Sequence, residues 1–158
     1  MAMATIGNSE ALTRIFGRWP LFHDAEVLSI SLDREGQYPY YGPTLDMAIH
    51  VFEMTSEVDD RGYYVLRHHT LVRFRFHQVV EVALEGFNHQ NDLYGLNIID
   101  ISERQMEWVR FGVKLDSSFG VGAAFHCRAV TVLSVEPYNP QTEPQSPRQS
   151  PPGVVGEE

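Results

Sequence analysis

The feature that most constrains this chain is an alternation of apolar and polar residues that recurs in seven separate segments. Apolar side chains at every second position are typical of a β-strand with one buried face. Residues 26–33 show the pattern clearly, because Leu28, Ile30 and Leu32 alternate with serines. The seven predicted strands span residues 26–33, 44–54, 63–77, 79–85, 94–101, 106–115 and 123–135. Turn-rich segments join most of them, which favours antiparallel pairing.

Charges and apolar side chains within these segments predict how two of the strands lie. Arg73 and Arg75 share one face of the third segment, and Glu81 and Glu85 of the next segment are their predicted partners, since cross-strand ion pairs are common in sheets. The same segment 79–85 alternates these acidic residues with apolar ones, which predicts one buried face. Its predicted inward residues are Val80, Val82 and Leu84.

One short helix is predicted before the strands, over residues 8–17. Its apolar residues Leu12, Ile15 and Phe16 share one face at helical spacing, Asn8 or Ser9 can cap its start, and Gly17 can end it. The predicted fold is therefore mainly β (α+β): an antiparallel β-sandwich or a curved, barrel-like sheet of about seven strands with one short N-terminal helix.

Composition divides the chain into two parts. Its 158 residues suffice for one domain with a sizeable core, and residues 1–136 are predicted to form that single β-rich domain. From Pro137 onwards the chain holds six of its nine prolines, mixed with Gln, Ser, Thr and Glu. Because no apolar periodicity survives there, residues 137–158 are predicted to be a disordered tail.

The charge and the cysteine content limit the partners and the compartment. A net charge of −9 disfavours nucleic-acid binding and suits a basic protein partner, although it also serves solubility alone. No apolar run is long enough to span a membrane, and no signal peptide begins the chain. The single cysteine, Cys127, fits a reducing compartment, so the predicted location is cytoplasmic.

No motif for catalysis or metal binding is present in the sequence. The seven histidines do not have the spacing of a zinc motif, and the chain lacks a serine nucleophile elbow. Cys127 lies in a strand pattern, where a buried and unreactive thiol is expected. The chain is therefore predicted to be no enzyme and to need no cofactor or metal.

Two polar stretches are nevertheless candidate sites. In the first, Trp19 and Phe22 form an aromatic plug followed by His23 and Asp24, which would either brace the turn or act as a base with its orienting carboxylate. The second is an amide-rich loop between two predicted strands, whose side chains could lock it to the first stretch or form a recognition surface. Its candidate residues are Asn88, Gln90 and Asn91.

A third candidate surface is the loop that follows the first predicted strand. It holds three tyrosines, which would anchor an interface or lie down on neighbouring apolar surface. They are Tyr38, Tyr40 and Tyr41.

The first two stretches resemble the signature segments of the immunity protein 50 family of bacterial polymorphic toxin systems. The matching strings are Trp19-Pro20-x-Phe22-His23-Asp24-Ala25-Glu26-Val27 and Gly86-Phe87-Asn88-His89-Gln90-Asn91. The resemblance runs over about residues 12–136, and it implies a protein that neutralises a cognate toxin, here predicted to be basic, by direct binding. The family offers no catalytic residues to carry over.

Two functions from different classes follow. The first is an immunity protein that blocks a toxin by contact. The alternative is a small enzyme or metal-dependent ligand-binding domain that uses His23, Asp24 and Asn88. Homodimerisation through an exposed strand edge is a further expectation, because open sheets leave edges that can pair.

Overall fold

The computed structural model describes residues 5–36 and 38–139. These residues form one α-helix, a short 3₁₀ helix η2 and eight strands, one strand more than predicted. The elements in chain order are α1 (Glu10–Phe16), β1 (Glu26–Asp33), β2 (Thr44–Val58), β3 (Tyr64–His77), β4 (Val80–Glu85), β5 (Asp92–Asp100), η2 (Ser102–Arg104), β6 (Phe111–Phe119), β7 (Gly122–Cys127) and β8 (Ala129–Pro137).

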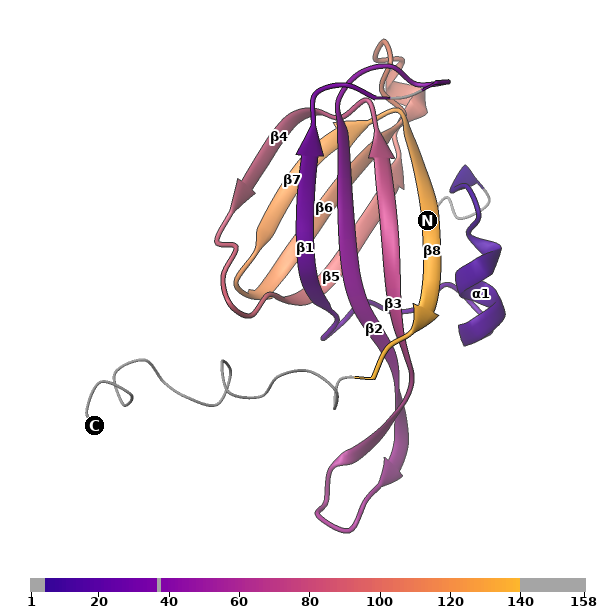
Figure 1. Ribbon diagram of the computed structural model, residues 1–158, viewed down its shortest axis with the longest axis vertical. Helices are drawn as coiled ribbons and strands as arrows, with labels where there is room; N and C mark the ends of the chain where they lie inside the picture. The colour runs from indigo at the N-terminus through magenta and orange to yellow at the C-terminus, as the bar shows by residue number, and fades with distance from the viewer. Residues whose placement is uncertain (1–4, 37, 140–158) are drawn as a thin grey trace, which may run out of the picture.

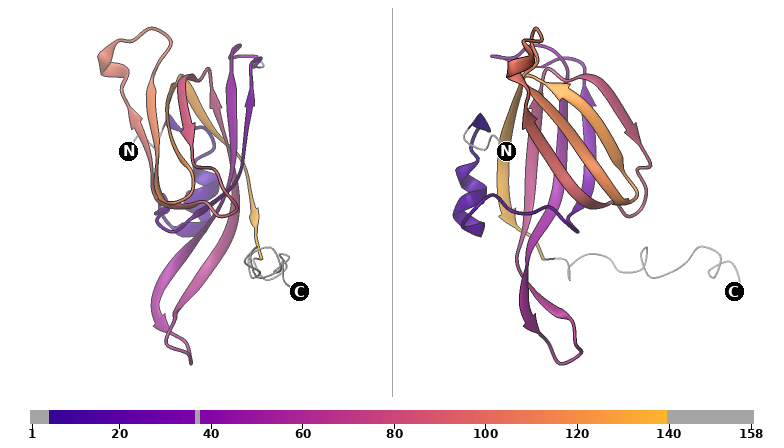
Figure 2. Two further views of the ribbon diagram at one scale, coloured as in Figure 1. Left: turned by 90° about the vertical axis from the view of Figure 1, so that its left-hand side faces the viewer. Right: turned by 180° about the vertical axis from the view of Figure 1, so that it is seen from behind.

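The eight strands form a single antiparallel sheet in the order β4-β7-β6-β5-β1-β2-β3-β8. The sheet folds over on itself, so that β1, β2, β3 and β8 face β5, β6, β7 and β4 (Figures 1 and 2). At the fold only one residue pair, Glu26 and Asp92, joins β1 to β5. The predicted antiparallel sandwich or curved sheet is thus confirmed.

The core fills the space between these two layers. From β2 it takes Leu45, Met47, Ile49 and Val51, which are the residues predicted to face inward and are almost completely buried. Phe74 stacks on Phe76 along β3, with ring centroids 5.9 Å apart, and Phe76 meets Phe125 of β7 edge-on across the layers at 5.1 Å. Period-two burial from both layers therefore makes one continuous apolar interior.

The first strand departs from the predicted alternation. A bulge between Val27 and Ser29 shifts its pairing with β2, so that Val27 is the buried residue. Beyond the shift, Leu32 pairs with the buried Leu45 and shares its face as predicted, although Leu32 itself is 53% exposed. The extra residue in the bulge brings Val27 onto the inward face in place of Leu28, which is where the strict alternation failed.

The predicted strand 123–135 is two strands. Arg128 separates β7, which pairs with β6 and β4, from β8, which pairs with β3 in the other layer. Its backbone N–H donates to the carbonyl of His77 at 2.9 Å, at the point where β3 also ends. The chain thus changes layer at this residue, and nothing in the apolar pattern on either side of it, in residues 123–127 and 129–135, marks the corner.

The fourth strand lies far from its predicted neighbour. β4 pairs with β7 at one edge of the sheet, and all six of its residues are exposed, so the predicted inward face of Val80, Val82 and Leu84 is wrong. Arg75 instead forms a two-pronged salt bridge with Asp46 of β2, with both N···O distances at 2.8 Å. Glu81 contacts His126. The turn between β3 and β4 changes layer, which a local pattern does not reveal.

The two edges of the sheet differ. Along β8, Gly7 exchanges hydrogen bonds with Val130 and Val132, and α1 lies beside the same strand (Figure 1). No segment of the described residues covers the outer edge of β4. Gly17 ends α1 in a left-handed conformation as predicted, while Ser9 caps its start without a side-chain hydrogen bond.

The connections alternate between two ends of the molecule, as antiparallel strands require. Long β2 and β3 extend past the body as a projecting hairpin arm, where a loop was predicted over 56–62 (Figure 1). The predicted boundary at residue 136 falls just before Pro137, the last residue of β8. The predicted tail from residue 140 onwards lies outside the described residues.

Candidate functional site

The amide-rich loop and the first polar stretch meet at the end of the sandwich that carries the arm. Asn91, only 2% exposed, joins them through both ends of its side chain. Its Oδ1 accepts from the N–H groups of Asn88 at 2.8 Å and Val121 at 3.1 Å. Its Nδ2 donates to the carbonyls of Asn88 at 2.9 Å and Val27 at 3.4 Å. A buried amide satisfied in this way ties three segments together.

Two glycines allow this close packing. A Cβ on Gly120 would lie 2.3 Å from the carbonyl oxygen of Gln90 and 2.6 Å from Oδ1 of Asn91. A Cβ on Gly86 would lie 2.6 Å from the carbonyl oxygen of Gly120. Both residues have positive φ, so the β4–β5 and β6–β7 turns need glycine for space and for conformation.

Trp19 and Phe22 belong to the core. Their rings lie 5.9 Å apart and each lies about as close to Phe74, at 6.2 and 6.0 Å. Nε1 of Trp19 is buried and has no hydrogen-bond partner among the described residues. The aromatic plug therefore seals the end of the sandwich.

The polar members of the two stretches reach the surface. His23 and Asp24 are exposed, and Nδ1 of His23 lies 3.3 Å from the Asp24 carboxylate. The His23 ring packs edge-on against Tyr94 at 5.2 Å. Asp24 adopts a left-handed conformation, and its N–H donates to the carbonyl of Leu93. Gln90 donates to the Asp92 carboxylate at 2.7 Å. A binding role for these residues stays a prediction.

The three tyrosines lie at the opposite end, in the β1–β2 loop. Tyr38 and Tyr41 are 81% and 66% exposed, and their rings meet edge-on. Tyr40 is half-buried against His77, with ring centroids 5.1 Å apart. Burial and the Arg75 charge lower the pKa of His77, opposed by Asp46. At that pKa the His77 ring is neutral at physiological pH, which suits packing against Tyr40.

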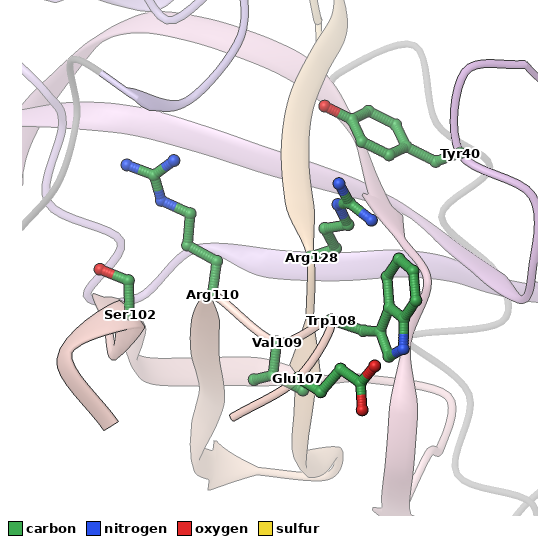
Figure 3. Close-up of a pocket in the computed structure, with 7 residues that line it drawn as sticks. All are labelled: Tyr40, Ser102, Glu107, Trp108, Val109, Arg110 and Arg128. Atoms are coloured by element: carbon green, nitrogen blue, oxygen red, sulfur yellow. The ribbon is translucent and has the colours of Figure 1, made fainter. Parts of the chain in front are cut away.

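Beside Tyr40 lies a cavity of about 520 Å³. Figure 3 shows the side chains that line it, which come from the β1–β2 loop, the β5–β6 connection and the corner at Arg128. They are Tyr40, Ser102, Glu107, Trp108, Val109, Arg110 and Arg128. We call the cavity with the exposed Tyr38 and Tyr41 the loop-end surface.

Arg128 occupies a stacked position in this cavity. Its guanidinium carbon lies 5.1 Å from the ring centre of Trp108 and 5.5 Å from that of Tyr40. No carboxylate of the described residues forms an ion pair with it. Cation–π contacts on two sides hold the guanidinium in place while leaving its N–H donors free of a counter-charge.

Arg110 differs, since Asp100 lies 3.6 Å away. Hydrogen bonds from Ser102, assisted by Arg110, lower the pKa of Asp100, so this carboxylate stays ionised. In Figure 3 the Glu107 carboxylate points away from both guanidinium groups. The cavity is therefore locally cationic in an acidic chain.

Trp108 holds a strained position on this surface. It is 61% exposed and has φ 69, a conformation that bulky residues rarely adopt. Trp108, Arg110 and Arg128 were not predicted as site residues. The pattern placed Trp108 and Arg110 in a strand over 106–115 and Arg128 in a strand over 123–135. The tyrosine loop was the only part of this surface that the sequence indicated.

Reactive side chains are scarce in the part of the chain that the structure describes. No cluster of three His, Cys, Asp or Glu residues suited to a metal ion occurs there. Cys127 is buried, and burial raises the pKa of its thiol to about 12. The predicted unreactive state of this cysteine agrees with that pKa.

Comparison of the sequence with known families identifies the family of this chain. Residues 8–138, which include every element from α1 to β8, match the family described as Immunity protein 50. The chain belongs to the Immunity protein 50 family. No curated protein and no solved structure matches it. None of the helices described in this member of the family has the length and apolarity needed to cross a membrane.

Proposed function

We propose that this chain is an immunity protein that neutralises a cognate bacterial toxin by binding it directly, without catalysis. The observation that carries the proposal is its membership of the Immunity protein 50 family over residues 8–138. The toxin is proposed to be basic, because the net charge of −9 would attract it and speed their encounter. The proposal places the complex in the cytoplasm, where the Cys127 thiol stays reduced.

The loop-end surface is the proposed contact face. Tyrosine, tryptophan and arginine are the residues that most often dominate binding energy at protein interfaces. Trp108 and Arg128 line the cavity, and Tyr38 and Tyr41 flank its Tyr40 in the same loop. Tyr38, Tyr41 and Trp108 are well exposed. The exposed His23 and Asp24 at the opposite end form the second candidate face.

A pull-down from the native cell at low and moderate salt tests the function. We expect one stoichiometric basic partner whose toxicity is suppressed when the two proteins are produced together. A chain that captures no partner at either salt, or one that fails to suppress the toxicity of its partner, would contradict the proposal.

Matched variants test the contact face. Trp108→Ala should weaken toxin binding by at least about 2 kcal/mol, which is typical of an interface hot spot. Tyr63→Ala is the control, because Tyr63 is 64% exposed near the tip of the arm, at the opposite end of the molecule. Equal toxin affinity in both variants would show that the loop-end surface is not the contact face, and it would not contradict the immunity function.

A further inference from the structure

We propose that the cavity at the loop-end surface binds one carboxylate group, the side chain of an Asp or Glu on the surface of a partner protein, at the free edge of the Arg128 guanidinium. The identification of this partner as the toxin rests on the proposed function, whereas the proposal that the cavity binds a carboxylate does not rest on it.

The stacking of Arg128 is the first argument. Trp108 and Tyr40 lie at 5.1 and 5.5 Å from its guanidinium carbon, so the arginine is held before any ligand arrives. Its N–H donors lie in the plane of the guanidinium, where a carboxylate can accept two of them side by side. An arginine held in place gives up less conformational freedom on binding.

The charges around the cavity are the second argument. Each of the nine ion pairs in the described residues gives an arginine, a lysine or a histidine a carboxylate, and one of them gives Arg110 its Asp100. Arg128 is in none of them. A cation without a counter-ion beside a cavity of about 520 Å³ is suited to an anion from outside.

The same surroundings favour a carboxylate over a phosphate. A carboxylate carries one charge and is planar, so it matches the planar fork of one guanidinium. A phosphate carries more charge, so the net charge of −9 would repel it more strongly. The remaining walls, Trp108, Val109 and Tyr40, suit the short apolar stem of a glutamate.

Such a site would add specificity to a complex formed by charge attraction. A basic toxin is attracted to the acidic chain in many orientations. An acidic side chain of the toxin, however, is accommodated only beside a cation that has no counter-ion. Placed at Arg128, it would fix the orientation and penalise toxins that have a basic residue at that point.

The experiment uses the free protein and N-acetylglutamic acid α-amide, which carries one side-chain carboxylate. The chain has two tryptophans, so their indole N–H signals in a nitrogen–proton NMR spectrum separate the cavity from the core. We expect a saturable shift of the Trp108 signal and a constant Trp19 signal. The neutral analogue N-acetylglutamine α-amide, which has nearly the same shape, should produce no shift at equal ionic strength.

Variants of two arginines make the assignment. Arg128→Gln should weaken binding of the glutamate compound roughly tenfold or more, because a charge-assisted hydrogen bond is lost. Arg67→Gln, on the arm, should bind it as the original protein does. An unchanged Trp19 signal shows that each variant keeps its core, and Arg128→Lys, which keeps the charge without the planar fork, should also bind more weakly.

Four results would overturn the proposal: no shift at Trp108, an equal shift with the glutamine compound, an equal affinity in Arg128→Gln or Arg128→Lys, or tighter saturation by inorganic phosphate. Because no toxin takes part in this titration, a chain that binds the carboxylate but captures no toxin would contradict the proposed function alone.

Discussion

At the scale of single residues, Trp108 combines strain with exposure. A bulky residue in the left-handed region costs about 1–2 kcal/mol, while its stacking on Arg128 returns about 0.5–1 kcal/mol. A residue that lowers the stability of the folded state on balance is expected to have a role other than stability, and its position on this surface indicates binding.

This balance gives the first prediction. Trp108→Asn should leave the free energy of unfolding unchanged or raise it by up to about 1 kcal/mol, since Asn tolerates a positive φ. Toxin affinity should fall in the same variant. Urea unfolding and a binding titration measure the two effects, and a large loss of stability with full affinity would show that Trp108 is structural.

The second prediction concerns the buried amide of Asn91. Asn91→Ala leaves the N–H groups of Asn88 and Val121 without their acceptor, and each such buried group costs about 1–3 kcal/mol. We expect a loss of roughly 2–4 kcal/mol in urea unfolding. Asn97→Ala is the control: its exposed amide bonds only to Asp116, so a comparable loss there would refute this account.

The third prediction follows from His69, whose Nδ1 lies 2.9 Å from Nε2 of the buried His50. Burial lowers the pKa of His69 below its ordinary value near 6.5, so the folded state prefers the neutral ring. The unfolded chain then binds more protons, and stability must fall as the pH drops through about 6.5 toward the folded pKa.

Thermal unfolding between roughly pH 7.5 and pH 5.5 measures this effect, above the range in which carboxylates titrate. The melting temperature should be lower at the acidic end, and His69→Gln should make the dependence on pH shallower. His77, whose pKa is also lowered, accounts for part of the remaining slope. An identical slope in His69→Gln would contradict the assignment.

At the scale of elements, the β6–β7 turn provides a matched comparison. Gly120 and Gly62 both have φ 87, but only Gly120 has neighbours where a Cβ would be. Gly62→Ala should therefore cost only the strain of a left-handed alanine, about 1–2 kcal/mol. Gly120→Ala should cost clearly more, because the backbone at Gln90 must move as well. Chemical unfolding of the two variants measures both losses of stability. Equal losses would show that crowding around the Cβ is unimportant.

The elements also show what the sequence could predict. Alternation located β2 and β3 and the inward residues of β2, because residues 44–51 pair with residues 70–77 without a shift and the register slips only beyond Val51. It failed where the register slips at Val27 and where the chain changes layer at Arg128. Bulges and corners depend on which distant strand is the neighbour, and a local pattern contains no such information.

The candidate site follows the same logic. The amide-rich loop and the Trp19–Asp24 stretch were singled out from the sequence. Asn91 joins the backbone of its own loop to that of Val27, which follows the Trp19–Asp24 stretch. Trp108 and Arg128 could not be singled out, because their partnership exists only once the β5–β6 connection and the corner at the end of β7 meet. Of that surface, the sequence indicated only the loop with Tyr38, Tyr40 and Tyr41.

At the scale of the whole molecule, charge should govern how fast and how tightly the toxin binds. If the acidic chain attracts a basic toxin, association should slow and affinity should weaken as salt rises, because counter-ions screen the attraction. Surface plasmon resonance over a salt series measures both rates. An affinity independent of salt would refute the electrostatic part of the proposal but not the direct contact between the chain and the toxin.

The unequal edges of the sheet set a limit on assembly. Hydrogen bonds from Gly7 already occupy the β8 edge at Val130 and Val132, whereas the edge of β4 is uncovered among the described residues. Two copies that pair through β4 would use up this edge in both copies at once. Pairing of β4 with β4 would therefore stop at a dimer, because a fibre needs two growing ends on every subunit and this contact leaves no β4 edge free.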